Sequence, residues 1–252
     1  MKVASLVEGP ADAPAVIFGN SLGTTLELWD PQAAALRATH RVVRFDHRGH
    51  GRTPGTDRVD VADRAGDVLE LADELGLDRF SFVGLSLGGA VGQWLGANAP
   101  ERLDRLVLAS TAVRFPNAAT YLDRAAFVRR EGLAPVVEAG LGRWFTPRAD
   151  PAVVDRFRTM LLGIDPEGYA AGCEAVARWD FRSAASRIAA PALAVAGRDD
   201  PTTTPEVVRE VADAVPGARL VVLDGAHLCS AESPDAFTEA LLAHLDGKET
   251  AP

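Results

Sequence analysis

The 252-residue sequence contains only two cysteines, Cys173 and Cys229, which lie far apart in the chain. They form no Cys-x-x-Cys pair, so the sequence indicates neither a disulfide framework nor a zinc site. Reduced thiols are typical of a reducing compartment, and we expect a cytoplasmic protein that needs no metal. Cys229 is expected to be a small, buried apolar side chain.

Long apolar runs and basic segments are also missing from the chain. It has no stretch of 18 consecutive apolar residues, and its start lacks a basic segment followed by an apolar one, so neither a membrane span nor a signal peptide is expected. The formal net charge is −9. Nucleic acids and anionic membranes bind basic surfaces, so we expect neither as a partner. The sequence leaves open whether the protein forms a homo-oligomer.

The sequence does contain the material for one sizeable core, because 47% of its residues are hydrophobic. Apolar runs typical of buried strands alternate with segments of helical spacing. This alternation predicts an α/β fold with a mostly parallel sheet flanked by helices. The expected strands cover residues 3–7, 15–18, 41–45, 80–83, 103–109, 192–196 and 220–223. The expected helices cover residues 28–37, 56–75, 89–98, 205–214 and 234–245.

The pattern changes between residues 113 and 189, where the sequence contains no convincing strand. This region is expected to form short helices, because proline and glycine interrupt its helical spacing at many positions. The interruptions fall at Pro116, Gly132, Pro135, Gly140, Pro147, Pro151, Gly163 and Pro166. We therefore predict a single domain in which residues 1–112 and 190–252 form the core and residues 113–189 form an inserted helical cap.

Residues 84–88 read Gly-Leu-Ser-Leu-Gly and lie between an expected strand and an expected helix. This Gly-x-Ser-x-Gly pattern is typical of a nucleophile elbow, a strained turn that exposes the serine hydroxyl at the end of a strand. Taken alone, the pattern also fits a glycine-rich turn whose serine caps a helix. Its interpretation depends on whether the chain supplies partners for Ser86.

A serine nucleophile needs a histidine base, and the base needs an orienting carboxylate. Of the five histidines, only His227 both follows an expected strand and comes last in the chain order serine, acid, histidine. The acid is expected after the strand at residues 192–196, where Asp199 and Asp200 are adjacent. Neighbouring side chains in a turn point apart, so only one can face the histidine, and we favour Asp200. No organic cofactor is required for this chemistry.

Attack by a serine on a carbonyl also requires N–H donors for the oxyanion that forms. In this architecture one donor is the residue after the nucleophile, and the other comes from the loop after an early strand. Leu87 occupies the first position, and Leu22 occupies the second, in the Gly-Asn-Ser-Leu-Gly-Thr loop of residues 19–24. Elbow, acid, base and oxyanion loop all occur in the expected chain order, which predicts a serine hydrolase.

Over nearly its whole length, the chain resembles α/β-hydrolases of the 3-oxoadipate enol-lactonase type. The elbow and the Asp-His-Arg-Gly-His-Gly loop at residues 46–51 are shared by many α/β-hydrolases. Three further features point to the lactonases: Asn20 in the oxyanion loop, the Gln93-Trp94 pair after the elbow, and the Trp-Asp-Phe segment at residues 179–181.

The resemblance implies the α/β-hydrolase fold and a triad of Ser86, Asp200 and His227. It also implies hydrolysis of 3-oxoadipate enol-lactone to 3-oxoadipate, in the breakdown of aromatic compounds. The chain departs from the family pattern in the base loop, residues 225–230, which has one fewer small residue before the histidine and Cys229 after it. This departure affects local packing or specificity and removes no member of the triad.

The expected substrate is a small anionic lactone or ester, so a local cation should offset the negative field of the protein. Guanidinium groups are suited to carboxylates, and the candidates in the cap are Arg114, Arg143 and Arg178. Trp144 and Trp179 are candidates for the walls of the pocket. Surface solubility and core packing are the alternative roles for these five side chains.

Other reactions use the same triad, so the sequence also fits a carboxylesterase, a C–C bond hydrolase or a perhydrolase of the same fold. A ligand receptor without catalytic activity is the alternative from a different class. Haloalkane dehalogenases and epoxide hydrolases are disfavoured, because they carry an aspartate where this chain has Ser86.

Overall fold

The computed structural model describes residues 2–55 and 59–248. Within these residues, seven strands form one sheet in the order β1-β3-β2-β4-β5-β6-β7. The strands are β1 (Ser5–Glu8), β2 (Ala15–Gly19), β3 (Arg41–Phe45), β4 (Phe80–Leu85), β5 (Leu103–Ala109), β6 (Ala192–Gly197) and β7 (Arg219–Leu223). The edge strand β1 pairs antiparallel with β3, and the remaining neighbours pair in parallel. The predicted α/β fold with a mostly parallel sheet is confirmed.

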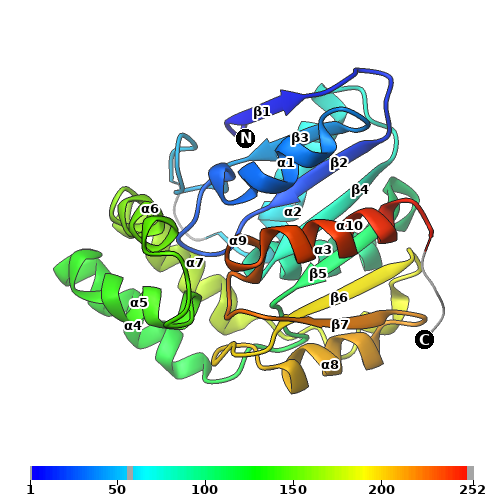
Figure 1. The fold of residues 1–252 in the computed structure, drawn as a ribbon. Helices are drawn as coiled ribbons and strands as arrows, with labels where there is room; N and C mark the ends of the chain where they lie inside the picture. Colours follow the sequence, from blue (N-terminus) through cyan, green and yellow to red (C-terminus); the bar gives the residue numbers. More distant parts are fainter. Residues whose placement is uncertain (1, 56–58, 249–252) are drawn as a thin grey trace.

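Helices cover both faces of the sheet. Figure 1 shows α1 and α10 in front of it and α2 and α3 behind it. The helices that flank the sheet or join its strands are α1 (Asp30–Leu36), α2 (Val61–Glu74), α3 (Leu87–Asn98), α8 (Pro205–Ala214), α9 (Cys229–Glu232) and α10 (Pro234–Leu245). Short 3₁₀ turns lie at η1 (Leu26–Trp29), η2 (Pro100–Arg102), η3 (Ala134–Val136) and η4 (Ala185–Arg187). Because the central strands β2 and β4 are covered on both sides, all of their residues are buried.

The predicted strand at residues 103–109 and the predicted helices at 205–214 and 234–245 match β5, α8 and α10. The expected helix at 28–37 is instead split into η1 and α1, because Pro31 lacks an N–H and occupies the first turn of α1. The expected first strand lies slightly later in the chain, at β1.

The helix expected at residues 56–75 begins later than predicted. Residues 56–58 lie outside the described residues, and α2 begins at Val61 because Asp60 forms a capping box with Asp63. The N–H of Asp60 donates to Asp63 Oδ2 at 2.8 Å. The expected interruption at Gly140 is also wrong. Gly140 lies inside α5 (Val137–Trp144), where a Cβ would come within 3.2 Å of Leu161 Cδ2 on the neighbouring helix.

Residues 113–189, all of which the structure describes, contain helices and no strand. The helices are α4 (Ala118–Glu131), α5, α6 (Pro151–Leu162) and α7 (Pro166–Arg178). Figure 1 shows them gathered at one end of the sheet. The two connections to the sheet lie side by side, because the N–H of Phe181 donates to the Val113 carbonyl oxygen at 2.7 Å. We propose that residues 113–189 form one cap, and we use that name below.

One continuous hydrophobic core joins the sheet to the flanking helices and extends into the cap. The core includes Phe18, Phe82 and Leu106 from the sheet as well as Val128 and Phe157 from the cap. Across residues 2–55 and 59–248, no helix combines the length and apolar character needed to cross a bilayer.

Candidate active site

Ser86 occupies the sharp turn between β4 and α3, with φ 58° and ψ −110°. Its backbone N–H donates to the Ala109 carbonyl oxygen at 2.8 Å, which ties the turn to β5. The turn is possible only with glycine on either side. A Cβ at Gly84 would lie 2.1 Å from the Gly88 carbonyl oxygen, and a Cβ at Gly88 would lie 2.2 Å from the Gly19 carbonyl oxygen. This left-handed conformation is strained for a serine and is typical of a nucleophile elbow.

Asp200 and His227 form a buried pair at the ends of β6 and β7. His227 Nδ1 lies 2.8 Å from Asp200 Oδ2, and the Asp200 side chain is 0% exposed. Asp199 faces away from this pair, and its carboxylate binds Arg148 at 2.7 Å on the surface. The contact to Asp200 leaves Nε2 of His227 available on the other side of the ring.

The Asp200 carboxylate is held in place by its own loop. The N–H groups of Thr202 and Thr203 donate to Oδ1 at 2.7 and 3.0 Å, and the Thr203 hydroxyl donates to Oδ2 at 2.6 Å. Burial alone would raise the pKa of Asp200, but the charge and hydrogen bond of His227 and the donors from Thr203 and Thr202 outweigh it. The pKa of Asp200 therefore lies below its ordinary value. The group stays ionised at neutral pH.

Leu22 and Leu87 lie on two backbone segments that are joined directly. The N–H of Gly88 donates to the Asn20 carbonyl oxygen at 3.0 Å, which ties the loop of residues 19–24 to the start of α3. Leu87 is the first residue of α3, so its N–H has no acceptor inside the helix. The two predicted oxyanion donors thus lie on neighbouring segments beside Ser86.

Ser86 and His227 face one small cavity under the cap, with a volume of about 30 Å³. Its lining includes the predicted residues Leu22, Arg143 and Trp144. Within the described part of the chain, no hydrogen bond links the Ser86 hydroxyl to His227. Catalytic hydrogen bonds of this kind often tighten only in the complex with substrate. Larger hollows, such as the 450 Å³ groove between α5 and α6, lie outside this cavity and contain neither Ser86 nor His227.

Comparison with known proteins shows the family to which the chain belongs. The family model described as alpha/beta hydrolase fold matches residues 14–234. The chain belongs to this family. It is 39% identical over 241 residues to 3-oxoadipate enol-lactonase 2 of Acinetobacter baylyi, with 93% of this chain and 90% of that protein covered. It is 33% identical over 236 residues to 3-oxoadipate enol-lactonase 1 of the same organism, with 92% and 89% covered.

Among solved structures, the α/β-hydrolase is similar to the enol-lactonase from Burkholderia xenovorans LB400. The TM-score is 0.94 at 39% identity, and the match covers 97% of this chain and 96% of that one. The resemblance inferred from the sequence is thereby confirmed.

Three of the predicted substrate-binding residues of this α/β-hydrolase do not line the Ser86 cavity. Trp179 instead donates from Nε1 to the Ala112 carbonyl oxygen at 3.0 Å and stacks on Phe181 at 4.7 Å. Arg178 binds Asp60 of the core at 2.5 Å, and Arg114 lies 4.0 Å from Asp180. The placement of Trp179 gives it a role in holding the cap connection, because Gln93 Nε2 also donates to the Ala112 carbonyl oxygen, at 3.1 Å.

Four cap residues that line the cavity were not predicted from the sequence: Tyr121, Arg124, Tyr169 and Val176. Arg124 lies over the Tyr121 ring, with 4.9 Å from the guanidinium carbon to the ring centroid, and donates to the Tyr169 hydroxyl at 3.4 Å. Among the described residues, no ion pair joins Arg124 or Arg143 to a carboxylate. Burial and the nearby charge of Arg124 lower the pKa of Arg143. The α/β-hydrolase therefore presents two uncompensated positive charges to the cavity.

The base loop is fastened to the cap. The N–H of Leu228 donates to the Trp144 carbonyl oxygen at 3.0 Å, at the end of α5. Glu232 accepts from the N–H of Ala226 at 2.9 Å and from the Thr146 hydroxyl. The unusual Cys229 is fully buried, and burial raises the pKa of its thiol to about 12, so it packs as expected for an apolar side chain.

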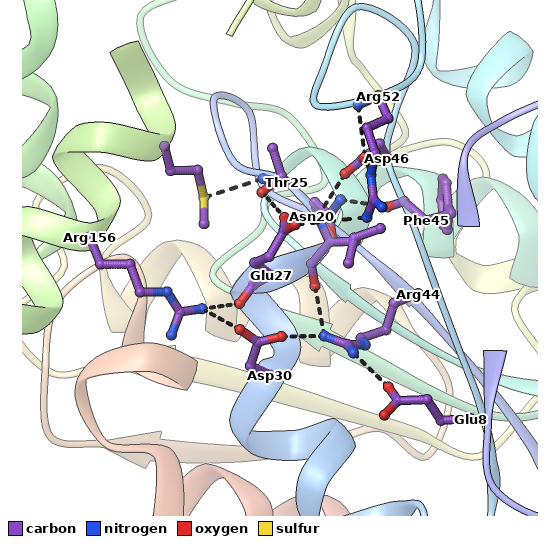
Figure 2. A network of polar contacts seen from close by, with 12 residues as sticks. Glu8, Asn20, Thr25, Glu27, Asp30, Arg44, Phe45, Asp46, Arg52 and Arg156 are labelled. Carbon is purple, nitrogen blue, oxygen red and sulfur yellow. Dashed lines mark hydrogen bonds and ion pairs between the residues drawn. The ribbon is translucent and has the colours of Figure 1, made fainter. Parts of the chain in front are cut away.

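A second set of polar contacts fastens α6 of the cap to the start of the core. Figure 2 shows Arg156 reaching Asp30 and the Glu27 carbonyl oxygen, while Asp30 also binds the buried Arg44. Arg44 in turn binds Glu8 of β1 at 2.5 Å. These contacts begin directly after the oxyanion loop, so the cap of this α/β-hydrolase is attached to the core there as well as at the base loop.

Proposed function

We propose that this protein hydrolyses 3-oxoadipate enol-lactone to 3-oxoadipate through an acyl-enzyme on Ser86. The observation that carries the proposal is the coexistence of two features in one cavity: a serine beside a buried Asp–His pair, and two arginines without a carboxylate partner among the described residues. The relatives named 3-oxoadipate enol-lactonase support the choice of substrate.

The charge of the substrate fits the arginines. A lactone of 3-oxoadipate uses one of the two carboxyl groups in the ring, so the other remains a free carboxylate. In the proposal, Arg143 and Arg124 bind this carboxylate, and a bidentate guanidinium contact orients the ring toward Ser86. A bound carboxylate would also offset the energetic cost of burying the charged guanidinium of Arg143. Trp144 and the two tyrosines form the walls.

In the proposed reaction, His227 Nε2 takes the Ser86 proton while Oγ attacks the lactone carbonyl carbon. The N–H groups of Leu22 and Leu87 stabilise the oxyanion, and removal of one such donor typically costs about 3 kcal/mol. Asp200 holds the imidazole tautomer and stabilises the imidazolium. Collapse of the tetrahedral intermediate re-forms the carbonyl and breaks the ring C–O bond.

The departing oxygen is an enolate that remains part of the acyl group. It takes the proton from His227 and relaxes to the ketone, which disfavours ring closure. His227 then removes a proton from water as the water attacks the acyl carbonyl carbon, and it returns that proton to Ser86 Oγ as the C–Oγ bond breaks and 3-oxoadipate is released. No step in this sequence calls for a cofactor.

The cavity of about 30 Å³ has room for about one water molecule, so the substrate requires side chains or the cap to shift on entry. Arg124 and Arg143 are both half-buried and have long, rotatable side chains. In the proposal their rearrangement around the carboxylate opens the space for the ring.

A spectrophotometric assay tests the proposal. Initial rates are measured on the enol-lactone and on p-nitrophenyl acetate, a neutral ester of similar size. We expect a kcat/KM for the lactone that exceeds that for the ester by several orders of magnitude. A preference for the neutral ester would contradict the lactonase proposal while leaving a carboxylesterase in place. Failure of Ser86 to react with a fluorophosphonate would contradict both and favour a ligand receptor.

We propose that the reaction takes place in the cytoplasm. The support for this is that Cys173 and Cys229 are both free and buried, as suits a reducing compartment.

A further inference from the structure

The Asp-His-Arg-Gly-His-Gly loop at residues 46–51 has no part in the reaction proposed above, yet it packs against the oxyanion loop. The N–H of Gly23 donates to His50 Nε2 at 3.0 Å, and this contact is buried. His50 itself is 1% exposed. The loop after β3 therefore contacts the backbone next to Leu22, one of the two proposed oxyanion donors.

The contact falls on the central peptide of a tight turn. The N–H of Thr24 donates to the Ser21 carbonyl oxygen at 3.2 Å, which makes Leu22 and Gly23 the two central residues. Gly23 has φ +82°, whereas Leu22 has a negative φ, as in a type II turn. Rotation of the central peptide would convert this turn to type I and reverse the direction of the Gly23 N–H. The His50 acceptor favours the type II form.

The tautomer of His50 is fixed by its second contact. Nδ1 lies 3.2 Å from the Arg48 carbonyl oxygen, which can only accept, so Nδ1 carries the proton. Nε2 then has the lone pair that the Gly23 N–H requires. Both contacts thus need the same neutral imidazole.

We propose that His50 is a positioning residue for the oxyanion donor Leu22, because its acceptor at Gly23 fixes the peptide that follows Leu22 and thereby the turn in which the Leu22 N–H lies. This inference rests on the proposed function only in that Ser86 attacks a carbonyl, and it applies to any ester substrate. His47 supports the same loop at its other end, where Nε2 donates to the Asn20 carbonyl oxygen at 3.1 Å.

The surroundings keep the imidazole neutral. Burial, and after it the charge of Arg64, lowers the pKa of His50 to about 3. Arg64 is itself buried on α2, and its guanidinium donates to the same Arg48 carbonyl oxygen at 3.2 Å. If His50 were protonated, its Nε2–H would face the Gly23 N–H and could not accept from it. Burial and the charge of Arg64 therefore keep Nε2 as an acceptor.

The test compares His50→Leu, which removes the acceptor, with His50→Gln, whose side-chain oxygen can reach the position of Nε2. We expect His50→Leu to lower kcat about 10-fold on both the enol-lactone and p-nitrophenyl acetate, with KM within about twofold, because the oxyanion is common to both substrates. His50→Gln should recover kcat to within about threefold of the wild type. Affinity for a boronic acid that forms a tetrahedral adduct with Ser86 should fall in parallel with kcat.

His40→Leu is the matched control, because His40 is a buried histidine outside the site and its side-chain hydrogen bond is local, to Thr39 at 2.9 Å. It reports what loss of a buried imidazole does to folding alone, with circular dichroism as the folding readout. The rate of Ser86 phosphonylation is measured in the same variants, so the comparison does not depend on the lactone. Unchanged kcat in His50→Leu, or equal losses in the Leu and Gln variants, would overturn the inference. Inactivity of the wild type on the lactone alone would count against the proposed function instead.

Discussion

In the core, the Asp200 carboxylate is fully buried and accepts hydrogen bonds from its own loop as well as from His227. In the cap, by contrast, Arg124 and Arg143 are half-buried, and their guanidinium groups have no carboxylate partner among the described residues. In the core, backbone N–H groups and short side chains therefore hold the Asp200–His227 pair in place. In the cap, long arginine side chains supply positive charge to the cavity. This difference predicts that changes in the core act on kcat and changes in the cap act on KM.

Ser86→Ala gives the largest expected effect. Removal of the nucleophile should lower kcat/KM for the enol-lactone by about 10⁴-fold or more, because the oxyanion donors and the binding residues alone give little rate. KM for any residual activity should change little, since the cap residues are untouched. A loss of less than about 10-fold would show that Ser86 is not the nucleophile.

The two adjacent aspartates provide a matched pair of variants. Asp200→Asn should lower kcat about 10³- to 10⁴-fold, because the amide favours the wrong tautomer of His227. Asp199→Asn should stay within about twofold, because it loses only an exposed ion pair to Arg148. Steady-state kinetics at neutral pH measure both. Similar losses of kcat in the two variants would contradict the assignment of Asp200, and not Asp199, as the carboxylate that orients His227.

Neutralising the cap arginines should have a smaller and different effect. Arg143→Gln and Arg124→Gln should each raise KM for the enol-lactone about 10- to 100-fold, because a charged hydrogen bond to the carboxylate is lost. KM for p-nitrophenyl acetate should stay within about twofold. Arg130→Gln is the control on the same helix as Arg124, since Arg130 is exposed and bonds Glu131. Equal changes in KM for both substrates would contradict the proposal that the cap arginines bind the substrate carboxylate.

The lowered pKa of Asp200 predicts a pH-dependent contribution to stability. The unfolded chain binds this proton more tightly than the folded one, so the group stabilises the fold above its ordinary pKa of 3.8, and this contribution is lost as pH falls through the folded value. The free energy of unfolding lost in Asp200→Asn should therefore be larger at pH 7 than at pH 3 in urea denaturation. A difference that is constant with pH would argue against the stabilised carboxylate.

Trp179→Phe should have the smallest effect on catalysis. The phenyl ring can still stack on Phe181, but the hydrogen bond to Ala112 is lost, so we expect a loss of about 1 kcal/mol in the free energy of unfolding. KM for the enol-lactone should stay within about twofold, because Trp179 does not line the cavity. A large rise in KM with unchanged stability would restore the original prediction of a substrate contact.

The sheet could be predicted, and the candidate catalytic residues could be proposed, because their signals are local. An apolar run marks β5, prolines and glycines bound the helical spacing of α8 and α10, and the strained Ser86 turn requires its neighbouring glycines. Chain order then selects His227. The choice between Asp199 and Asp200 needed the turn itself, in which the N–H of Asp199 donates to the Gly225 carbonyl oxygen and its side chain points outward.

Only some of the cap residues that face the cavity could be predicted: Arg143 and Trp144 were, whereas Arg124 was not. Arg124 lies on α4 among other charged residues, and only the packing of α4 against α7 turns it inward beside Tyr169. Trp179 was a reasonable wall residue from its type alone, but the side chain is used at the cap connection. Helical spacing identifies a buried face, but which buried residues reach the cavity depends on how helices distant in sequence cross.

The close contact of Gly49 with Gly168 limits how this enzyme scaffold can be redesigned. A Cβ at Gly49 would lie 2.3 Å from Gly168 Cα, and a Cβ at Gly168 would lie 2.2 Å from the Gly49 carbonyl oxygen. Gly49 precedes His50, so the first turn of α7 packs directly against the backbone beside the residue that we propose positions the oxyanion donor. A cap transplanted from another hydrolase to change the substrate range must have a glycine at the position of Gly168. Without it, we expect the chimera to lose kcat as well as its original specificity.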